Sequence, residues 1–284
     1  MFHQNGELAE APIALAEVQA YVYGARRAAA KLARMRGDDA RASALEAQAD
    51  NLRIKFEEAF WSERLGMYAL ALDGRKRPCA VRTSNAGQCL LTGIARPDRA
   101  RRVVETLLSQ DMFSGWGIRT LAAGEVRYNP MSYHNGSVWP HDNSLIAAGF
   151  AQYGFHDAVQ PVLSGLFAAS LFFDSHRLPE LFCGFHRRKG EGPTLYPVAC
   201  SPQAWAAGSV FLLLQAALGL TIDAVGRRVS VSGGRFPESL DRLVVRDLRI
   251  AEDASIDLLF QRHHQDVGVM VLRREGRVEV TITK

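Results

Sequence analysis

The stretch from Tyr128 to Ser144 concentrates aromatic and hydrogen-bonding side chains between two turn dipeptides, Asn129-Pro130 and Asn135-Gly136. The side chains that can do chemistry there are Tyr128, Tyr133, His134, Asn135, Trp139, His141 and Asp142. Flat aromatic faces stack on apolar ligand surfaces, while amide, imidazole and carboxylate groups satisfy hydroxyls. This mixture favours a sugar over a phosphate or a metal ion. The alternative is a solvated loop with buried tyrosines.

A metal site is a weak hypothesis for this stretch. His134 and His141 are seven residues apart and have one adjacent carboxylate, Asp142, which is a poor match to known metal-ligand spacings. The chain has four cysteines, but none of them shows the paired close spacing of a metal site. We therefore expect neither a metal nor a cofactor.

Composition excludes several classes of protein. The 284 residues are 48% hydrophobic and 23% charged, as in ordinary globular proteins. The formal charge of +4 comes from arginines scattered along helices, which argues against a nucleic-acid partner. No apolar run reaches the length of a membrane span and no secretory signal opens the sequence, so we expect a cytoplasmic protein without a membrane partner.

The elements that position these residues are predicted from the helical periodicity of the sequence. Apolar residues recur at steps of three and four over several segments, separated by short links that force antiparallel hairpins. The expected helices are 12–36, 40–61, 84–94, one opened by Pro97, 138–153, 157–173 and 203–220. Asp39 is expected to cap the second helix, and a short strand is expected near 68–72. The sequence thus predicts three helical hairpins followed by a last helix.

From residue 222 onward the hydrophobic period changes from that of a helix to two. The expected strands lie near 248–250, 256–260, 267–271 and 278–282, and the expected turns are 233–234, 252–253, 264–266 and 274–276. This pattern predicts a small antiparallel β region after the helices. With the boundary near Thr221, the chain divides into a helical domain, 1–220, and a β-rich region, 221–284.

Three segments resemble the bacterial amylo-α-1,6-glucosidase, or glycogen-debranching-type, family. They are Glu17 to Tyr21, Tyr133 to Asn143, and Leu178-Pro179-Glu180-Leu181 together with Ser201 to Trp205. The resemblance implies a mainly α fold that forms part of an (α/α)6 toroid. It also implies an inverting glycoside hydrolase that acts, without a metal, on α-glucosidic bonds of glycogen-like or maltooligosaccharide substrates.

The resemblance also assigns roles to individual residues. Glu180, in the Pro-Glu pair before the final helix, would be the general base, although it could instead be a cap or ion-pair partner within its loop. Glu191 is the rival carboxylate, ranked second because its glycine neighbours make its position less fixed. Trp139, His141 and Asp142 would bind the terminal glucose. For Asp142 the alternative is a charge interaction with a helix N-terminus.

Four more residues enter through the same resemblance. Trp116 and Arg119 belong to a Gly-Trp-Gly-Ile-Arg run that matches the family pattern. Trp116 could form a sugar platform, and Arg119 could either bind ligand or be buried against loop carbonyls. Glu17 and Gln19 would lie near the cavity, whereas the simpler interpretation makes them exposed side chains of the first helix.

The family is longer at the amino terminus, and its segment with the general acid corresponds to a position before Phe2. We therefore expect a truncated chain that carries the base but not the acid and is weak or inactive alone. Part of a toroid would leave apolar helix faces open, which predicts self-association or a complementing amino-terminal chain. The alternative function is a non-catalytic carbohydrate-binding or interaction module.

Overall fold

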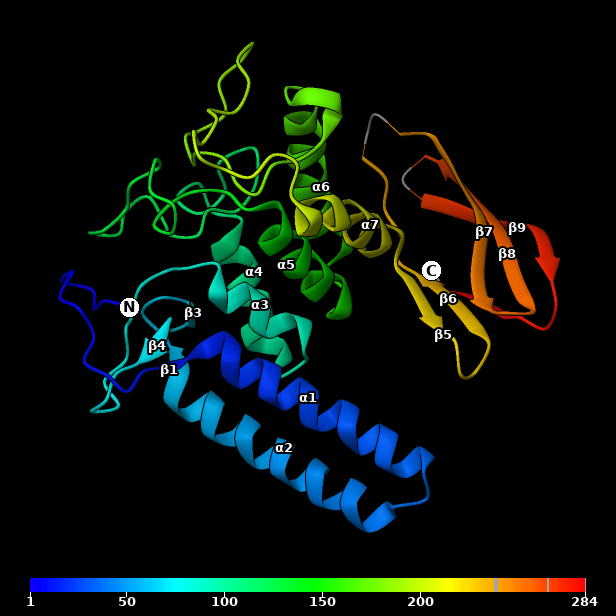
Figure 1. Ribbon diagram of the computed structural model, residues 1–284, viewed down its shortest axis with the longest axis horizontal. Coiled ribbons are helices and arrows are strands. Elements are labelled where there is room, and N and C mark those ends of the chain that lie inside the picture. Colours follow the sequence, from blue (N-terminus) through cyan, green and yellow to red (C-terminus); the bar gives the residue numbers. More distant parts are fainter. Residues whose placement is uncertain (238–239, 265, 284) are drawn as a thin grey trace.

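The structure, a computed structural model, describes residues 1–237, 240–264 and 266–283 (Figure 1). The fold is mainly α in its first part and β in its last. The α helices of the described residues are α1 (Ala16–Met35), α2 (Asp39–Phe60), α3 (Asn85–Leu91), α4 (Pro97–Leu107), α5 (Pro140–Gln152), α6 (His156–Ser170) and α7 (Ala204–Leu218). A short 3-10 helix, η1 (Asp174–His176), follows α6. Each helix expected from periodicity is found, with ends that differ by a few residues.

The helix ends show where sequence patterns lose accuracy. Asp39 is the first residue of α2 and not its cap, because the side chain of Asp38 accepts the hydrogen bond from Arg41 N at 3.0 Å. Ser84 does precede α3, but its side chain makes no cap hydrogen bond. Two adjacent aspartates cannot be told apart by periodicity, since both suit a helix N-terminus.

The helices form hairpins that pack one after another. Helix α1 packs on α3, α3 on α5, and α5 on α7, while α2, α4 and α6 each lie against their hairpin partner (Figure 1). Gly149 allows α5 to approach α3, because a Cβ there would lie 2.8 Å from Leu90 Cβ and from Leu91 N. The odd-numbered helices therefore form one continuous series.

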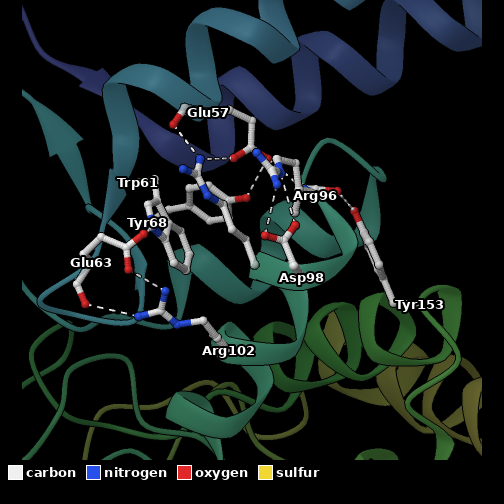
Figure 2. Close-up of polar contacts among 10 residues, drawn as sticks. Glu57, Trp61, Glu63, Tyr68, Arg96, Asp98, Arg102 and Tyr153 are labelled. Carbon is white, nitrogen blue, oxygen red and sulfur yellow. Dashed lines mark hydrogen bonds and ion pairs between the residues drawn. The ribbon is translucent and has the colours of Figure 1, made fainter.

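A polar cluster joins α2 to α4 (Figure 2). The buried Glu57 accepts from the Tyr68 hydroxyl at 2.8 Å and from Arg96 N at 2.7 Å, and the Arg99 guanidinium pairs with its second oxygen. Around it, Arg102 contacts Glu63 at 2.6 Å. Both carboxylate oxygens of Glu57 are satisfied, as a buried charge requires.

Two small ladders lie near the helical hairpins. Strand β1 (Ala14–Leu15) pairs with β4 (Ala71–Leu72), and β2 (Trp61–Ser62) pairs with β3 (Met67–Tyr68), both antiparallel. The single strand expected near 68–72 is thus two separate strands. Its residues are buried on both sides, so alternation could not reveal the break between them.

The last part of the chain forms two three-stranded sheets, with β5 (Leu220–Asp223), β6 (Arg228–Ser232), β7 (Arg242–Ala251), β8 (Ala254–His263), β9 (Asp266–Glu275) and β10 (Glu279–Thr283). One sheet has the order β7-β8-β9 and is antiparallel throughout. The other has the order β10-β6-β5, and β10 pairs with β6 in parallel. The expectation of one purely antiparallel region is therefore wrong, because alternation fixes which face is buried but not which strand is the neighbour.

The change from helix to strand falls at Gly219, which ends α7 with φ of 60°. The division into domains at residue 220 remains a prediction. Of the turn expected at 264–266, residue 265 lies outside the described residues. Within the part that the structure describes, no helix is both long and apolar enough to cross a membrane.

Candidate active site

A cavity of about 630 Å³ opens where the amino-terminal ends of three helices meet the loop before α5. Helix α3 contributes Asn85 and Gln88, α5 contributes His141 and Asp142, and α7 contributes Trp205. The loop adds Tyr133, His134, Asn135 and Trp139. The serial packing of the odd-numbered helices brings these ends together.

Local hydrogen bonds fix the loop that feeds α5. Pro140 occupies the first turn of the helix, where a missing N–H does no harm. Asn143 accepts from Ile118 N at 2.7 Å and donates to Ile118 O at 3.0 Å, which joins α5 to the segment before it. The backbone of Val138 forms antiparallel β-bridges with Arg119 and with Phe182. Three segments that are distant in the sequence thus run side by side.

Aromatic rings form one wall of the cavity. The Trp139 indole donates to Tyr133 O at 3.2 Å and to Ser137 Oγ at 2.9 Å, which fixes its plane. The ring of His134 is parallel to that of Trp139 at 6.1 Å, and His141 stacks on Trp205 at 4.0 Å. Rings held in this way offer flat faces to a sugar ring.

Glu180 adjoins this wall and is 8% exposed. The Tyr133 hydroxyl donates to its Oε1 at 2.7 Å and Cys200 N donates to its Oε2 at 3.3 Å. This bond to Glu180, together with burial, raises the pKa of Tyr133 to about 12, so the phenol remains a donor. Glu180 is therefore linked through Tyr133 to the cavity, although it is not one of the residues that line it.

His141 faces the same space. Burial lowers the pKa of His141, against the opposing influence of the Asp142 and Glu180 charges. Its Nδ1 has no hydrogen-bond partner within the described part of the chain. A largely neutral imidazole with a free nitrogen can donate to or accept from a sugar hydroxyl.

A second polar group lies at the ends of α1, α3 and α5. Asp142 is 4% exposed, and its Oδ1 accepts from the Gln88 amide. Its Oδ2 has no partner among the described residues, and neither has Oε2 of Glu17. Burial raises the pKa of both carboxyls, and the Asp142 charge adds to the shift at Glu17. Buried carboxylate oxygens without partners can accept hydrogen bonds from a ligand.

Two predicted site residues lie away from the cavity lining. Trp116 is 2% exposed, and Arg187 lies over its ring at 4.3 Å. Arg119 is fully buried and donates to the carbonyl oxygen of Gly184 at 2.6 Å and to those of Gln110 and Asp111. The alternative role of Arg119, burial against loop carbonyls, is the one its contacts describe.

Gln19 and Glu191 also lie outside the lining. Gln19 donates to the carbonyl oxygen of Leu15, the N-cap residue of its own helix, at 3.3 Å. The Glu191 side chain is 58% exposed and pairs with Arg188 at 3.1 Å. Its glycine neighbours allow an outward loop, which leaves Glu180 as the buried carboxylate of the pair.

Sequence reasoning missed four contributors, namely Tyr21, Asn85, Gln88 and Trp205. A polar Ser84-Asn85 pair and Gln88 at the start of an otherwise apolar helix were the available signal. Tyr21 and Trp205 lie in the segments that carry the family resemblance but attracted no role. Their side chains matter because of helix packing, which periodicity alone does not define. No group of three or more metal-ligating side chains is found among the described residues.

Residues 4–177 match the profile of the mannosylglycerate hydrolase MGH1-like glycoside hydrolase domain. A comparison with curated proteins gives no match. Among solved structures, the GH63 mannosylglycerate hydrolase from Thermus thermophilus superposes with a TM-score of 0.56 at 19% identity, over 71% of this chain and 45% of that one. The family match, residues 4–177, lies in the helical part of the chain.

Two further structures extend the likeness. A sialidase gives a TM-score of 0.71 at 13% identity, over 98% of this chain and 27% of its own. Neutral trehalase from Saccharomyces cerevisiae gives 0.54 at 15% identity, over 72% and 38%. At such identities the likeness shows the fold alone. The chain spans less than half the length of each of these three proteins.

Proposed function

The chain belongs to the MGH1-like glycoside hydrolase family, and from this premise we propose that it takes part in inverting hydrolysis of an α-glycosidic bond, with Glu180 as the general base. In such a reaction one carboxylate activates water on the face of the sugar opposite the leaving group. The observation that carries the proposal is the buried Glu180 carboxylate, held by Tyr133 beside an aromatic cavity.

The proposed substrate is an α-glucoside of the maltooligosaccharide or glycogen-like class, as for an amylo-α-1,6-glucosidase. Trp139 and Trp205 would pack on the ring of the terminal glucose, while His141 and Asp142 would bind its hydroxyls. The Thermus mannosylglycerate hydrolase has been described in complex with glucose, which supports glucose as the sugar in this proposal. No step of this reaction requires a cofactor.

The helix arrangement supports a partial (α/α)6 toroid. The odd-numbered helices would form the inner layer and the even-numbered helices the outer one. Helices α1 and α7 end the inner series, and each has large exposed apolar residues: Val18, Val22 and Leu32 on α1, and Val210 and Phe211 on α7. Such faces suit a complementing amino-terminal chain or self-association.

Inverting hydrolysis also needs a carboxylic acid that protonates the leaving oxygen. Among the described residues we propose Glu180 as the base and the cavity residues as glucose contacts, and we assign the acid to none of them. The cytoplasm remains the proposed compartment, since Cys79, Cys89, Cys183 and Cys200 are all unpaired.

A substrate with a good leaving group separates the base from the acid. Fluoride leaves without protonation, so α-glucosyl fluoride should be hydrolysed by a chain that has the base alone. We expect measurable fluoride release, with β-glucose as the first product in proton NMR. Glu180→Gln should lower the rate about a hundred- to ten-thousand-fold.

Glu191→Gln is the matched control, because Glu191 is an exposed carboxylate in the same loop. An unchanged rate in Glu180→Gln, or an equal loss in Glu191→Gln, would reject the base assignment. Binding of maltooligosaccharides that Trp139→Ala abolishes, with no fluoride release under any condition, would support the non-catalytic carbohydrate-binding module instead.

A further inference from the structure

A series of hydrogen bonds leads from α1 through α3 to α5 and reaches the lining of the cavity. The Tyr21 hydroxyl donates to Gln88 Oε1, and Gln88 Nε2 donates to Asp142 Oδ1. Gln88 and Asp142 line the cavity. Each of the three residues comes from a different helix, and all three helices belong to the series of odd-numbered helices.

The chemistry of the three side chains determines which of them donates and which accepts in each hydrogen bond. An ionised carboxylate can only accept, so Gln88 must turn its NH2 group toward Asp142 and its carbonyl away. The Tyr21 hydroxyl donates to that carbonyl and thereby holds the amide in this orientation. Because an amide has two nearly isosteric ends, an oriented neighbour is what distinguishes one rotamer from the other.

The remaining oxygen of Asp142 points to a ligand. Oδ2 is buried and has no partner among the described residues, although Asp142 lines the cavity. The charged and titratable groups that act on Asp142 and its cluster are Glu17 and Tyr21 on α1, Cys89 on α3 and His141 on α5. Arg127 is the only Arg or Lys among the described lining residues, and it donates to Gly6 O at 2.7 Å. Among the described lining residues, no Arg or Lys therefore offers Asp142 a counter-charge.

We propose that Gln88 and Tyr21 are positioning residues that hold Asp142 with one oxygen bound to the protein and Oδ2 presented to a hydroxyl of the sugar. The inference rests on the proposed function, because it takes a sugar as the ligand. A carboxylate presented in this way accepts but does not donate. It selects a sugar that carries a hydroxyl at the facing position and rejects one with hydrogen or fluorine there.

The positioning itself can be tested without a sugar, by carbon-13 NMR titration of the Asp142 carboxyl, identified by its loss in Asp142→Asn. Burial raises the pKa of the Asp142 carboxyl, whereas the Ser84 hydroxyl and then the Gln88 amide favour its ionised form. Gln88→Leu should therefore raise the pKa of Asp142, and Tyr21→Phe should raise it by less. Tyr23→Phe is the control, since Tyr23 lies on the same helix and makes no described hydrogen bond to Gln88.

Selectivity is measured by tryptophan fluorescence with glucose and its singly deoxygenated and singly fluorinated analogues. For the unmodified protein, there should be at least one glucose hydroxyl whose replacement by hydrogen or by fluorine lowers the affinity roughly tenfold. Gln88→Leu should remove most of this difference in affinity between glucose and the analogue. Tyr21→Phe should reduce the logarithm of the affinity ratio by about half. Tyr23→Phe should keep it.

The two proposals fail in different ways. If Gln88→Leu and Tyr21→Phe both leave the Asp142 titration unchanged, the positioning inference is wrong, whatever the chain hydrolyses. If the titration shifts as expected but no analogue binds, the sugar as ligand is rejected and the inference is overturned in that part. Should Gln88→Leu fail to fold, Tyr21→Phe still tests the inference, because Tyr21 is partly exposed and loses only its hydroxyl. Its effects on the Asp142 pKa and on sugar selectivity then decide the outcome.

Discussion

Glu57 and Asp142 are both carboxylates buried between neighbouring helices, with 9% and 4% of their surface exposed. Around Glu57, a phenol, a backbone N–H and the Arg99 guanidinium satisfy both oxygens (Figure 2). Around Asp142, the neutral Gln88 amide donates to one oxygen, and the other oxygen has no partner among the described residues. The first network is closed within the protein, whereas the second has room for one more donor.

This difference separates a structural role from a binding role. A buried charge with a full set of partners stabilises a packing arrangement, and loss of one partner is strongly destabilising. A buried carboxylate with a free oxygen opposes folding until a ligand provides the missing bond. The same residue type thus serves stability between α2 and α4 and recognition between α3 and α5.

The largest expected effect is on the closed network. Glu57→Gln would leave the Arg99 guanidinium without its counter-charge, so the free energy of unfolding should fall by about 3 to 5 kcal/mol. Asp142→Asn, the matched change in the open network, should alter it by less than about 1 kcal/mol. Chemical denaturation measures both. Equal losses in the two variants would remove the distinction.

The next effect concerns the donor to the proposed base. Tyr133→Phe deletes the hydroxyl that donates to Glu180 at 2.7 Å. A hydrogen bond to a charged group is worth about 1.5 to 3 kcal/mol, so hydrolysis of α-glucosyl fluoride should slow by roughly ten- to a hundredfold. Tyr196→Phe is the control, because its ring packs edge-on against Tyr133 at 5.7 Å. A similar loss in both variants would indicate a packing defect.

The contrast also marks what sequence could predict. The helices followed from apolar spacing, and the loop before α5 followed from its aromatic density, because both signals are local. Glu57 attracted no role, since its partners Tyr68 and Arg99 lie on other elements. Gln88 was missed for the same reason: its amide has meaning only where α1 and α5 meet it.

Family resemblance extended the sequence prediction unevenly. It drew attention to Asp142, which lines the cavity, and to Glu180, which lies beside it and accepts from the lining residue Tyr133. It also drew attention to Trp116 and Arg119, whose matching pattern reflects a buried loop in this structure. A motif can contain residues that pack in the core as well as residues that bind ligand. The burial and the hydrogen-bond partners of each side chain in the structure distinguish these two roles.

A third prediction uses the pH dependence of stability. Burial raises the folded-state pKa of Asp142 above 3.8 and that of Glu17 above 4.5. Stability from these groups is therefore full below those values and is lost as pH rises through the raised values. The stability of Asp142→Asn should therefore rise relative to that of the unmodified chain as pH rises from about 4 to about 7. A constant difference across this range would show that Asp142 titrates normally.

The smallest expected effect comes from replacing one tryptophan beside each of the two carboxylate networks. Arg99 and Arg102 lie over Trp61 at 4.8 and 5.0 Å, so Trp61 belongs to the closed network. Trp205 is 48% exposed and stacks on His141. Trp205→Ala should weaken glucose binding about threefold, as loss of one aromatic face suggests, with little change in stability.

Trp61→Ala should do the reverse, lowering thermal stability and leaving glucose affinity unchanged. Calorimetric titration and thermal unfolding of both variants measure the four values. If Trp61→Ala weakens glucose binding as much as Trp205→Ala does, the helical core and the cavity respond as one unit. The free oxygen of Asp142 would then reflect the packing of the whole core and not a site kept open for a ligand.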